Sequence, residues 1–122
     1  MKLSIYEFRG LRRVYAIIEL EGEERGLVDA LRSLDEKGLL SFMERVFGKV
    51  RTLKYGNGAY LGDSRVDFFY AEVELDDYSI YRLEVYPGAA TVIADSTFAD
   101  LSERAKRLVR EAYYLNTGGH CT

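Results

Sequence analysis

Residues 68–85 read FFYAEVELDDYSIYRLEV, and their pattern carries the clearest signal for the fold of this chain. Two runs alternate between apolar and polar side chains, and the Asp76-Asp77 pair separates them as a turn. Alternation with a period of two is typical of strands that have one buried and one solvated face. The stretch therefore predicts an antiparallel hairpin in a sheet whose two faces differ in character.

The same alternation marks further strands before and after this hairpin. Gly56-Asn57-Gly58 is a strong signal for a hairpin turn, and Pro87-Gly88 predicts another turn. We therefore expect an antiparallel sheet of about five to six strands, two of which form an N-terminal hairpin. The additional strands are expected at residues 2–8, 14–21, 49–55 and 91–94, with a short segment at 59–61 after the glycine turn.

Apolar residues at helical spacing predict three helices. Ser33 followed by Glu36 predicts a capping box at the start of the second helix, and Asp35 is an alternative N-cap for it. Gly48 is placed to end the same helix, because glycine tolerates the left-handed backbone that often follows a helix. The helices are expected over residues 23–33, 36–47 and 98–115.

The expected order is a strand hairpin, two short helices, the remaining antiparallel strands and a long C-terminal helix. This order is similar to the helix-grip arrangement of START and Bet v 1 domains, in which a curved sheet wraps a long last helix. The resemblance implies an α+β fold whose sheet packs on that helix, with another two-layer α+β sandwich as the alternative. A ferredoxin-like fold is disfavoured because no strand is expected after the last helix.

Length and composition predict one small domain inside the cell. The 122 residues suit a single core, and a chain with 48% apolar and 30% charged residues is not expected to be disordered. A single cysteine, Cys121, excludes an internal disulfide and favours a reducing compartment. The first residues do not resemble a signal peptide, and no apolar run reaches the roughly 18 residues of a membrane span. We therefore expect a cytoplasmic protein that does not associate with membranes.

The usage of polar residues is unusual for so short a chain. Gln is absent and only two Asn residues occur, whereas Glu and Arg are abundant. Depletion of thermolabile residues together with enrichment in charged residues is typical of proteins from thermophiles. The composition therefore predicts a thermophilic source.

The sequence predicts neither catalysis nor a bound metal. The one histidine, His120, adjoins Cys121 near the end of the chain, where neighbouring residues cannot hold a nucleophile and a base in fixed geometry. No glycine-rich phosphate loop occurs. Asp63, Asp67 and Asp95 offer carboxylates, but the sequence does not show whether these converge. We expect no cofactor and no metal ion; a non-enzymatic role is favoured, and an enzyme that relies on carboxylates and tyrosines stays open as an alternative.

A basic segment with interleaved tyrosines is the strongest binding signal. Residues 49–65 contain four cations and one anion. Proteins that bind single-stranded nucleic acid use such strands, since bases stack on rings and phosphates seek cations. The whole chain is acidic, with a net charge of −3, which disfavours this partner. The candidate ligand- or partner-binding residues are Lys49, Arg51, Lys54, Tyr55, Asn57 and Tyr60.

Ten tyrosines give the chain an interface-like composition, because tyrosine combines a large apolar body with a polar tip. Tyr70, Tyr81 and Tyr86 fall in the expected sheet, where they face the core, a cavity or a second subunit. We expect a non-enzymatic oligomeric or partner-binding domain, with a homodimer as the first expectation. The alternatives are an apolar or aromatic small molecule bound between the sheet and the last helix, and single-stranded nucleic acid bound by residues 49–65.

Overall fold

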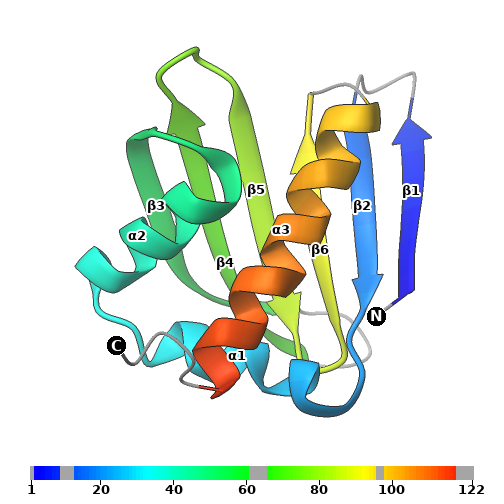
Figure 1. The fold of residues 1–122 in the computed structure, drawn as a ribbon, viewed down its shortest axis with the longest axis vertical. Coiled ribbons are helices and arrows are strands. Elements are labelled where there is room, and N and C mark those ends of the chain that lie inside the picture. The colour runs from blue at the N-terminus through cyan, green and yellow to red at the C-terminus, as the bar shows by residue number, and fades with distance from the viewer. Residues whose placement is uncertain (1, 9–12, 61–65, 96–97, 118–122) are drawn as a thin grey trace.

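The computed structural model describes residues 2–8, 13–60, 66–95 and 98–117. Six antiparallel strands form one sheet in the order β1-β2-β6-β5-β4-β3 (Figure 1). The expected α+β class and sheet are thus confirmed. The strands are β1 (Lys2–Phe8), β2 (Arg13–Glu19), β3 (Val50–Tyr60), β4 (Val66–Leu75), β5 (Ile80–Tyr86) and β6 (Ala89–Ala94).

All the helices lie on one face of this sheet (Figure 1). The long last helix crosses the sheet beside β6 and β2, as the resemblance to the helix-grip arrangement implies. No helix in the described ranges has the length and apolar character needed to cross a membrane. The helical elements are η2 (Gly22–Gly26, a 3-10 helix), α1 (Leu27–Arg32), α2 (Glu36–Phe47) and α3 (Phe98–Thr117).

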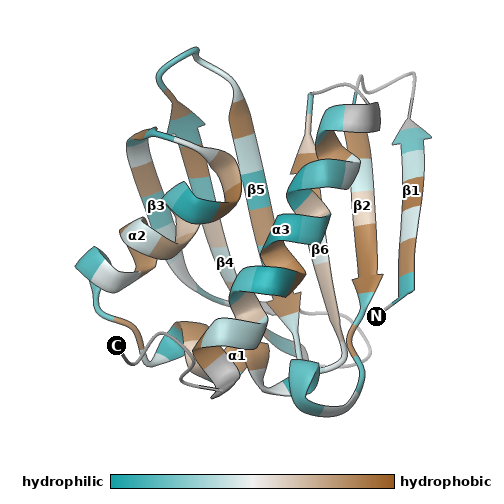
Figure 2. Ribbon diagram, in the orientation of Figure 1, coloured by the Kyte–Doolittle hydropathy of each residue, from teal (hydrophilic) through white to brown (hydrophobic). Residues whose placement is uncertain are grey.

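The core fills the space between the sheet and the helices. Every second residue of the central strands is buried there, and the outward surface of α3 is largely hydrophilic (Figure 2). Leu101, Ala105 and Leu108 place the apolar stripe of α3 on the sheet, and each is 0% exposed. Phe42 and Val46 do the same for α2. Burial of these stripes is the main force that holds the layers together.

The start of α2 corrects the predicted capping box. Asp35 is the N-cap, and its carboxylate accepts a 2.7 Å hydrogen bond from the backbone N–H of Gly38. Ser33 instead ends α1, where its hydroxyl donates to the carbonyl of Ala30. The capping box with Ser33 was wrong because Ser33 belongs to the end of α1, and the alternative N-cap, Asp35, is confirmed.

The predicted turn at Gly56-Asn57-Gly58 is also wrong, since β3 runs unbroken through these residues. Each glycine lies opposite an aromatic residue of β4, in the pairs Gly56 with Tyr70 and Gly58 with Phe68. A methyl group at position 58 would overlap the Phe68 ring. The glycines therefore make room for rings that lie across the neighbouring strand, a role that is unrelated to turn formation.

Candidate binding surface on the open face of the sheet

The face of the sheet opposite the helices, here called the open face, is covered by no other described element. Its side chains come from the strand positions that alternate with the core positions. Many of them are apolar or aromatic and half-buried, because they pack on one another across the strands. The half-buried members are Tyr15, Ile17, Phe68, Tyr70, Glu72, Glu74, Arg82, Glu84, Tyr86, Thr91 and Ile93.

Five of these side chains form a connected group, the sheet-face cluster, which consists of Phe68, Tyr70, Arg82, Glu84 and Tyr86. Arg82 Nε donates a 2.7 Å hydrogen bond to Glu84, and the Arg82 guanidinium lies 4.7 Å from the centroid of the Tyr70 ring. Tyr86 donates a 3.1 Å hydrogen bond to the other oxygen of Glu84. The Phe68 and Tyr86 rings lie 5.1 Å apart. Each side chain is thus held in place by a neighbour before any partner arrives.

The environment of Tyr86 keeps its hydroxyl protonated. Partial burial raises the pKa of Tyr86 to about 12, and the negative charge of Glu84 adds to the effect. A phenol with so high a pKa serves as a hydrogen-bond donor at neutral pH and cannot act as a base there. The cluster is therefore suited to binding and not to proton abstraction.

A hollow of about 620 Å³ opens beside the cluster on the same face. Arg82 and Glu84 form one part of its wall. A smaller hollow of about 130 Å³ adjoins it and shares Glu72 and Ile80. The remaining wall of the larger hollow is made by Arg13, Tyr15, Thr91, Ile93, Ala94 and Asp95.

The chemical groups of this face support recognition better than catalysis. It presents carboxylates, guanidinium groups, phenols and aliphatic side chains. The carboxylate of Glu84, which lies in the sheet-face cluster, already accepts hydrogen bonds from Arg82 and Tyr86. Within the described ranges, no three His, Cys, Asp or Glu residues lie close enough to hold a metal ion. Asp63 lies outside those ranges, and Asp67 and Asp95 lie toward opposite ends of the sheet.

The structure distributes the candidate residues of segment 49–65 over two faces. Lys54 is on the open face opposite Glu72, whereas Tyr55 is on the helix side and 41% exposed. Asn57 accepts a 2.7 Å hydrogen bond from Arg32. The side chain of Tyr60 lies outside the described part of the chain. Alternation along β3 thus keeps these residues from forming one surface.

The two remaining cations of this set lie near carboxylates. Lys49 is 3.8 Å from Asp76, and Arg51 is 3.9 Å from Glu74. The Arg51 guanidinium also lies 4.8 Å from the centroid of the Tyr78 ring. These neighbours reduce the positive potential of the segment. A nucleic-acid site needs a strong positive potential, so the segment is less suited to that partner.

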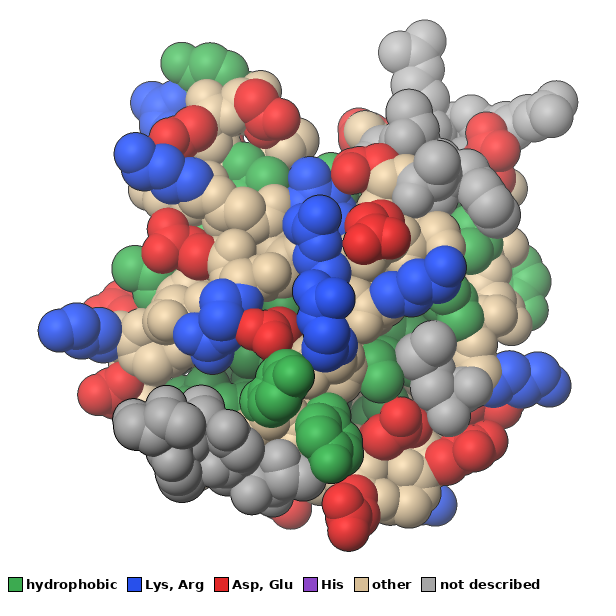
Figure 3. Space-filling model, in the orientation of Figure 1, with side chains coloured by type: hydrophobic (Ala, Val, Ile, Leu, Met, Phe, Trp, Pro, Cys, Tyr) green, Lys and Arg blue, Asp and Glu red, His purple; other side chains and the backbone are tan. Residues whose placement is uncertain are grey.

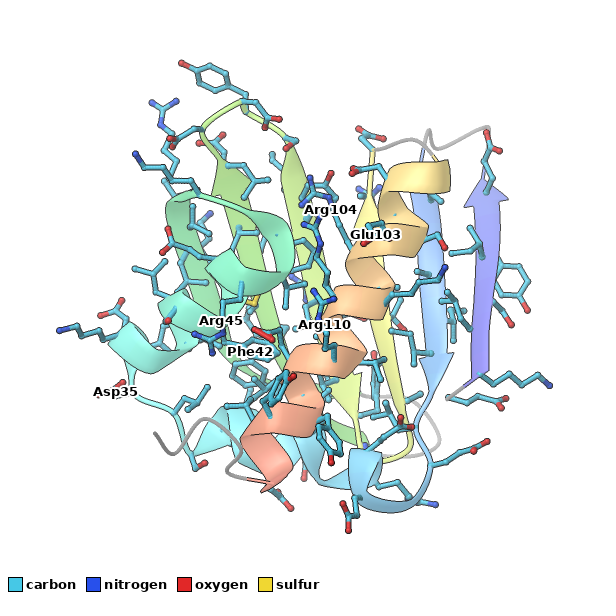
Figure 4. All side chains as sticks on the ribbon, in the orientation of Figure 1. Asp35, Phe42, Arg45, Glu103, Arg104 and Arg110 are labelled. Carbon is cyan, nitrogen blue, oxygen red and sulfur yellow. The ribbon has the colours of Figure 1, made fainter. Side chains whose placement is uncertain are left out.

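A second basic feature lies on the helix side, where Lys and Arg side chains follow the length of α3 (Figure 3). Arg45 and Arg110 lie at the seam between α2 and α3, and Arg104 lies further along α3 (Figure 4). Arg45 of α2 pairs with Glu111 of α3 at 2.8 Å, and Arg104 of α3 donates to the carbonyl of Phe47 in α2. Both arginines therefore join structural elements to one another.

A mostly apolar groove of about 500 Å³ lies near the same seam. Leu34 and Gly38 form one wall, and Tyr114 and Leu115 of α3 form the other. Nothing in the structure indicates what would fill it. The open face, with its connected cluster and adjoining hollow, is the better candidate for a binding surface.

Comparison with protein-family models, with curated proteins and with solved structures found no match to this chain. The function therefore has to be argued from the geometry of the open face.

The sequence contained part of the signal for this site. Tyr70 and Tyr86 were recognised as sheet tyrosines that face the core, a cavity or a subunit. Their convergence with Arg82 was missed, because it depends on the register in which β4 pairs with β5. The usable signal was a period of two in both strands, which places Tyr70 on the same face as Glu84 once the register is known.

Proposed function

We propose that this protein is a non-enzymatic domain that associates with protein chains, including copies of itself, through the open face of its sheet. The observation that carries the proposal is the sheet-face cluster, an arginine and three aromatic rings fixed by mutual contacts on a face that no other described element covers. Aromatic residues and arginine dominate the energetic centres of protein interfaces. A surface that is ordered beforehand loses little conformational entropy when it binds.

The aliphatic side of the face supports the same proposal. Ile17 and Ile93 lie half-buried beside Tyr15, and Ile80 is 51% exposed. A partner that covered these groups would remove apolar surface from water, which stabilises a complex. Charged residues lie among them and would limit which partners fit.

A small molecule in the larger hollow is the second candidate. Its volume of about 620 Å³ falls in the usual range for ligand sites, roughly 300–1,000 Å³. The hollow is open and has several charged residues in its wall, whereas ligand sites are mostly apolar and enclosed. We therefore favour a protein over a small molecule as the partner of the open face.

The experiment is light scattering coupled to size exclusion, over a wide range of protein concentration, on the wild type and two variants. Ile93→Lys places a charge in the middle of the open face. Tyr114→Lys places the same charge on α3, at a residue that is 45% exposed. We expect a dimer or larger assembly for the wild type and for Tyr114→Lys, and a monomer for Ile93→Lys.

Circular dichroism on each variant ensures that only folded protein is compared. A wild type that is monomeric at every concentration contradicts the proposal. If native mass spectrometry shows that this monomer carries a reproducible small adduct, the ligand-binding candidate takes its place.

A further inference from the structure

We infer that the partner is a second copy of this chain, packed face to face about a two-fold axis that crosses the strands of the open face. This inference rests on the proposed function, because it assigns a partner and an arrangement to the same surface. It follows from the strand register, which sorts the open-face residues into rows across the sheet.

Two neighbouring rows lie at the middle of the face. The first row contains Tyr15, Ile93, Arg82, Glu72 and Lys54, which are in register from β2 through β6, β5 and β4 to β3. The second row contains Ile17, Thr91, Glu84, Tyr70 and Gly56 in the same strand order. A two-fold axis midway between the rows places each row opposite the other row of the second copy.

On the central strands this arrangement pairs opposite charges. Arg82 lies opposite Glu84 of the second copy, and symmetry repeats the contact. Within one chain Arg82 already binds Glu84 through Nε, and a guanidinium has further N–H groups to donate. Two arginines and two glutamates would therefore form a closed, alternating group at the centre of the interface.

The flanking positions are complementary as well. Tyr15 lies opposite Ile17, which pairs two largely apolar side chains. Glu72 lies opposite Tyr70, so that a carboxylate meets a phenolic hydroxyl that can donate to it. On the edge strand, Lys54 lies opposite Gly56, which is covered by the ring of Tyr70, so that an ammonium group meets an aromatic ring there.

The rows on either side of the two central rows also bring opposite charges together on β2. Arg13 and Glu19 stand at the two ends of the open-face positions of this strand, so the same axis sets them opposite each other. No pair of like charges is brought together in these rows or in the central ones. Such self-complementarity is what a two-fold symmetric interface requires.

The size of the face also fits a dimer. Six strands about 4.8 Å apart and about seven residues long span roughly 700 Å². Stable protein interfaces bury about 800 Å² on each partner. Two sheets that pack face to face keep their strand directions within about 30° of each other. Twist therefore displaces opposed residues least on the central strands.

Charge reversal at the centre tests this arrangement. Arg82→Glu gives a chain with two acidic residues at positions 82 and 84, and Glu84→Arg gives a chain with two basic ones. We expect each variant alone to dimerise at least tenfold more weakly than the wild type. An equimolar mixture should form the heterodimer in preference to either homodimer, because all four central charges are then opposed to unlike ones. Native mass spectrometry of the mixture measures this preference directly.

A matched pair on α3 serves as the control. Glu103 and Arg107 lie 3.8 Å apart, and both are exposed to solvent. Glu103→Arg and Arg107→Glu reproduce the same changes in charge away from the open face. Their mixture should show no preference beyond the statistical one.

The possible results separate this inference from the proposed function. If the wild type dimerises and Ile93→Lys disrupts the dimer, but the central mixture shows no heterodimer preference, the arrangement is wrong and the binding face stands. If the wild type is monomeric at every concentration, both fail.

If the reversed-charge variants do not fold, a cysteine pair provides the test in their place. In a Cys121→Ser background, Thr91→Cys on one chain and Ile93→Cys on the other occupy opposed positions. Mild oxidation of the mixture should link them as a covalent heterodimer. Failure to link, in a wild type that dimerises, overturns the arrangement.

Discussion

Tyr81 on β5 donates a 2.6 Å hydrogen bond to the carboxylate of Asp100 in the first turn of α3. The Tyr81 ring also stacks on Phe47, the last residue of α2, at a centroid distance of 5.0 Å. One side chain thus ties the sheet to both long helices. Asp100 at this position also suits the positive end of the α3 dipole.

Removal of the Tyr81 hydroxyl should weaken this connection. We expect Tyr81→Phe to lower the free energy of unfolding by about 1–2 kcal/mol, since it deletes a hydrogen bond to a charged group that is only partly buried. Urea denaturation measures the change. Tyr6→Phe is the control, because Tyr6 is 50% exposed and should shift stability by less than about 0.5 kcal/mol. Equal effects for the two variants would show that the bond to Asp100 contributes nothing.

Arg104 completes the same connection and should not be replaceable by lysine. Its guanidinium donates to Asp100 and to the carbonyl of Phe47, and it lies 4.4 Å from the centroid of the Tyr81 ring. Lysine cannot make these contacts in one geometry, so Arg104→Lys should cost about 1–3 kcal/mol. Arg107→Lys alters an exposed pair with Glu103 and should be nearly neutral. Thermal and chemical denaturation compare the two, and equal losses would contradict the assigned role.

The packing of Phe68 on Gly58 predicts strong coupling between the two positions. Gly58→Ala would force the Phe68 ring away from Tyr86, and we expect a loss of about 1–3 kcal/mol. In a Phe68→Ala background the same substitution should cost much less, because the ring that it displaces is gone. A double-mutant cycle in denaturant gives the coupling energy. Additive effects would mean that the ring and the glycine do not interact.

The N-cap of α2 offers a test of where that helix begins. Asp35→Ala removes the acceptor for the Gly38 N–H and should cost about 1 kcal/mol. Ser33→Ala should have a much smaller effect, because the Ser33 hydroxyl bonds back to Ala30 at an exposed site. A larger loss for Ser33→Ala than for Asp35→Ala, measured by denaturation, would restore the capping box predicted from the sequence.

Tyr86 should lose its proton at a higher pH than an ordinary tyrosine, and the stability of the fold should fall over the same alkaline range. Its pKa is raised to about 12 in the folded protein, first by burial and then by the charge of Glu84. Because the folded pKa exceeds the unfolded value of about 10, the stabilisation from the protonated phenol is complete below pH 10 and is lost as pH rises from about 10 to 12.

Ultraviolet titration of the wild type against Tyr86→Phe isolates the ionisation of this phenol. Glu84→Gln removes the nearby charge and should lower the pKa of Tyr86, while burial keeps it above the ordinary value. An unchanged pKa in Glu84→Gln would show that Glu84 does not act on Tyr86.

Much of the fold could be predicted from periodicity. The alternation of Phe69, Ala71 and Val73 with Tyr70 and Glu72 predicted β4 and its buried face, and the structure confirms both. The bounds of α2 agree with the expected 36–47. These features are local, since one face of a strand or helix must be apolar if it packs on a core.

Local patterns were insufficient at two places, of which the first depends on a distant neighbour. Gly56 and Gly58 were predicted to turn the chain, but they accommodate rings from β4. Ser33 and Asp35 were both predicted as the N-cap of α2, and the structure confirms Asp35. A local pattern cannot show which strand will lie beside a glycine, and it cannot choose between two capping residues so close in sequence.

Periodicity was sufficient to predict the α+β class, the number of strands within one, the amphipathic helices and the buried face of the sheet. It could not predict the open face, where Arg82, Glu84 and Tyr86 of β5 meet Tyr70 and Phe68 of β4. The fold likewise places Lys54 on the open face but Tyr55 and Asn57 on the helix side. The physical reason is that side-chain direction along a strand is set locally by the period of two, whereas neighbours across a sheet are set by register, which depends on burial of the whole core.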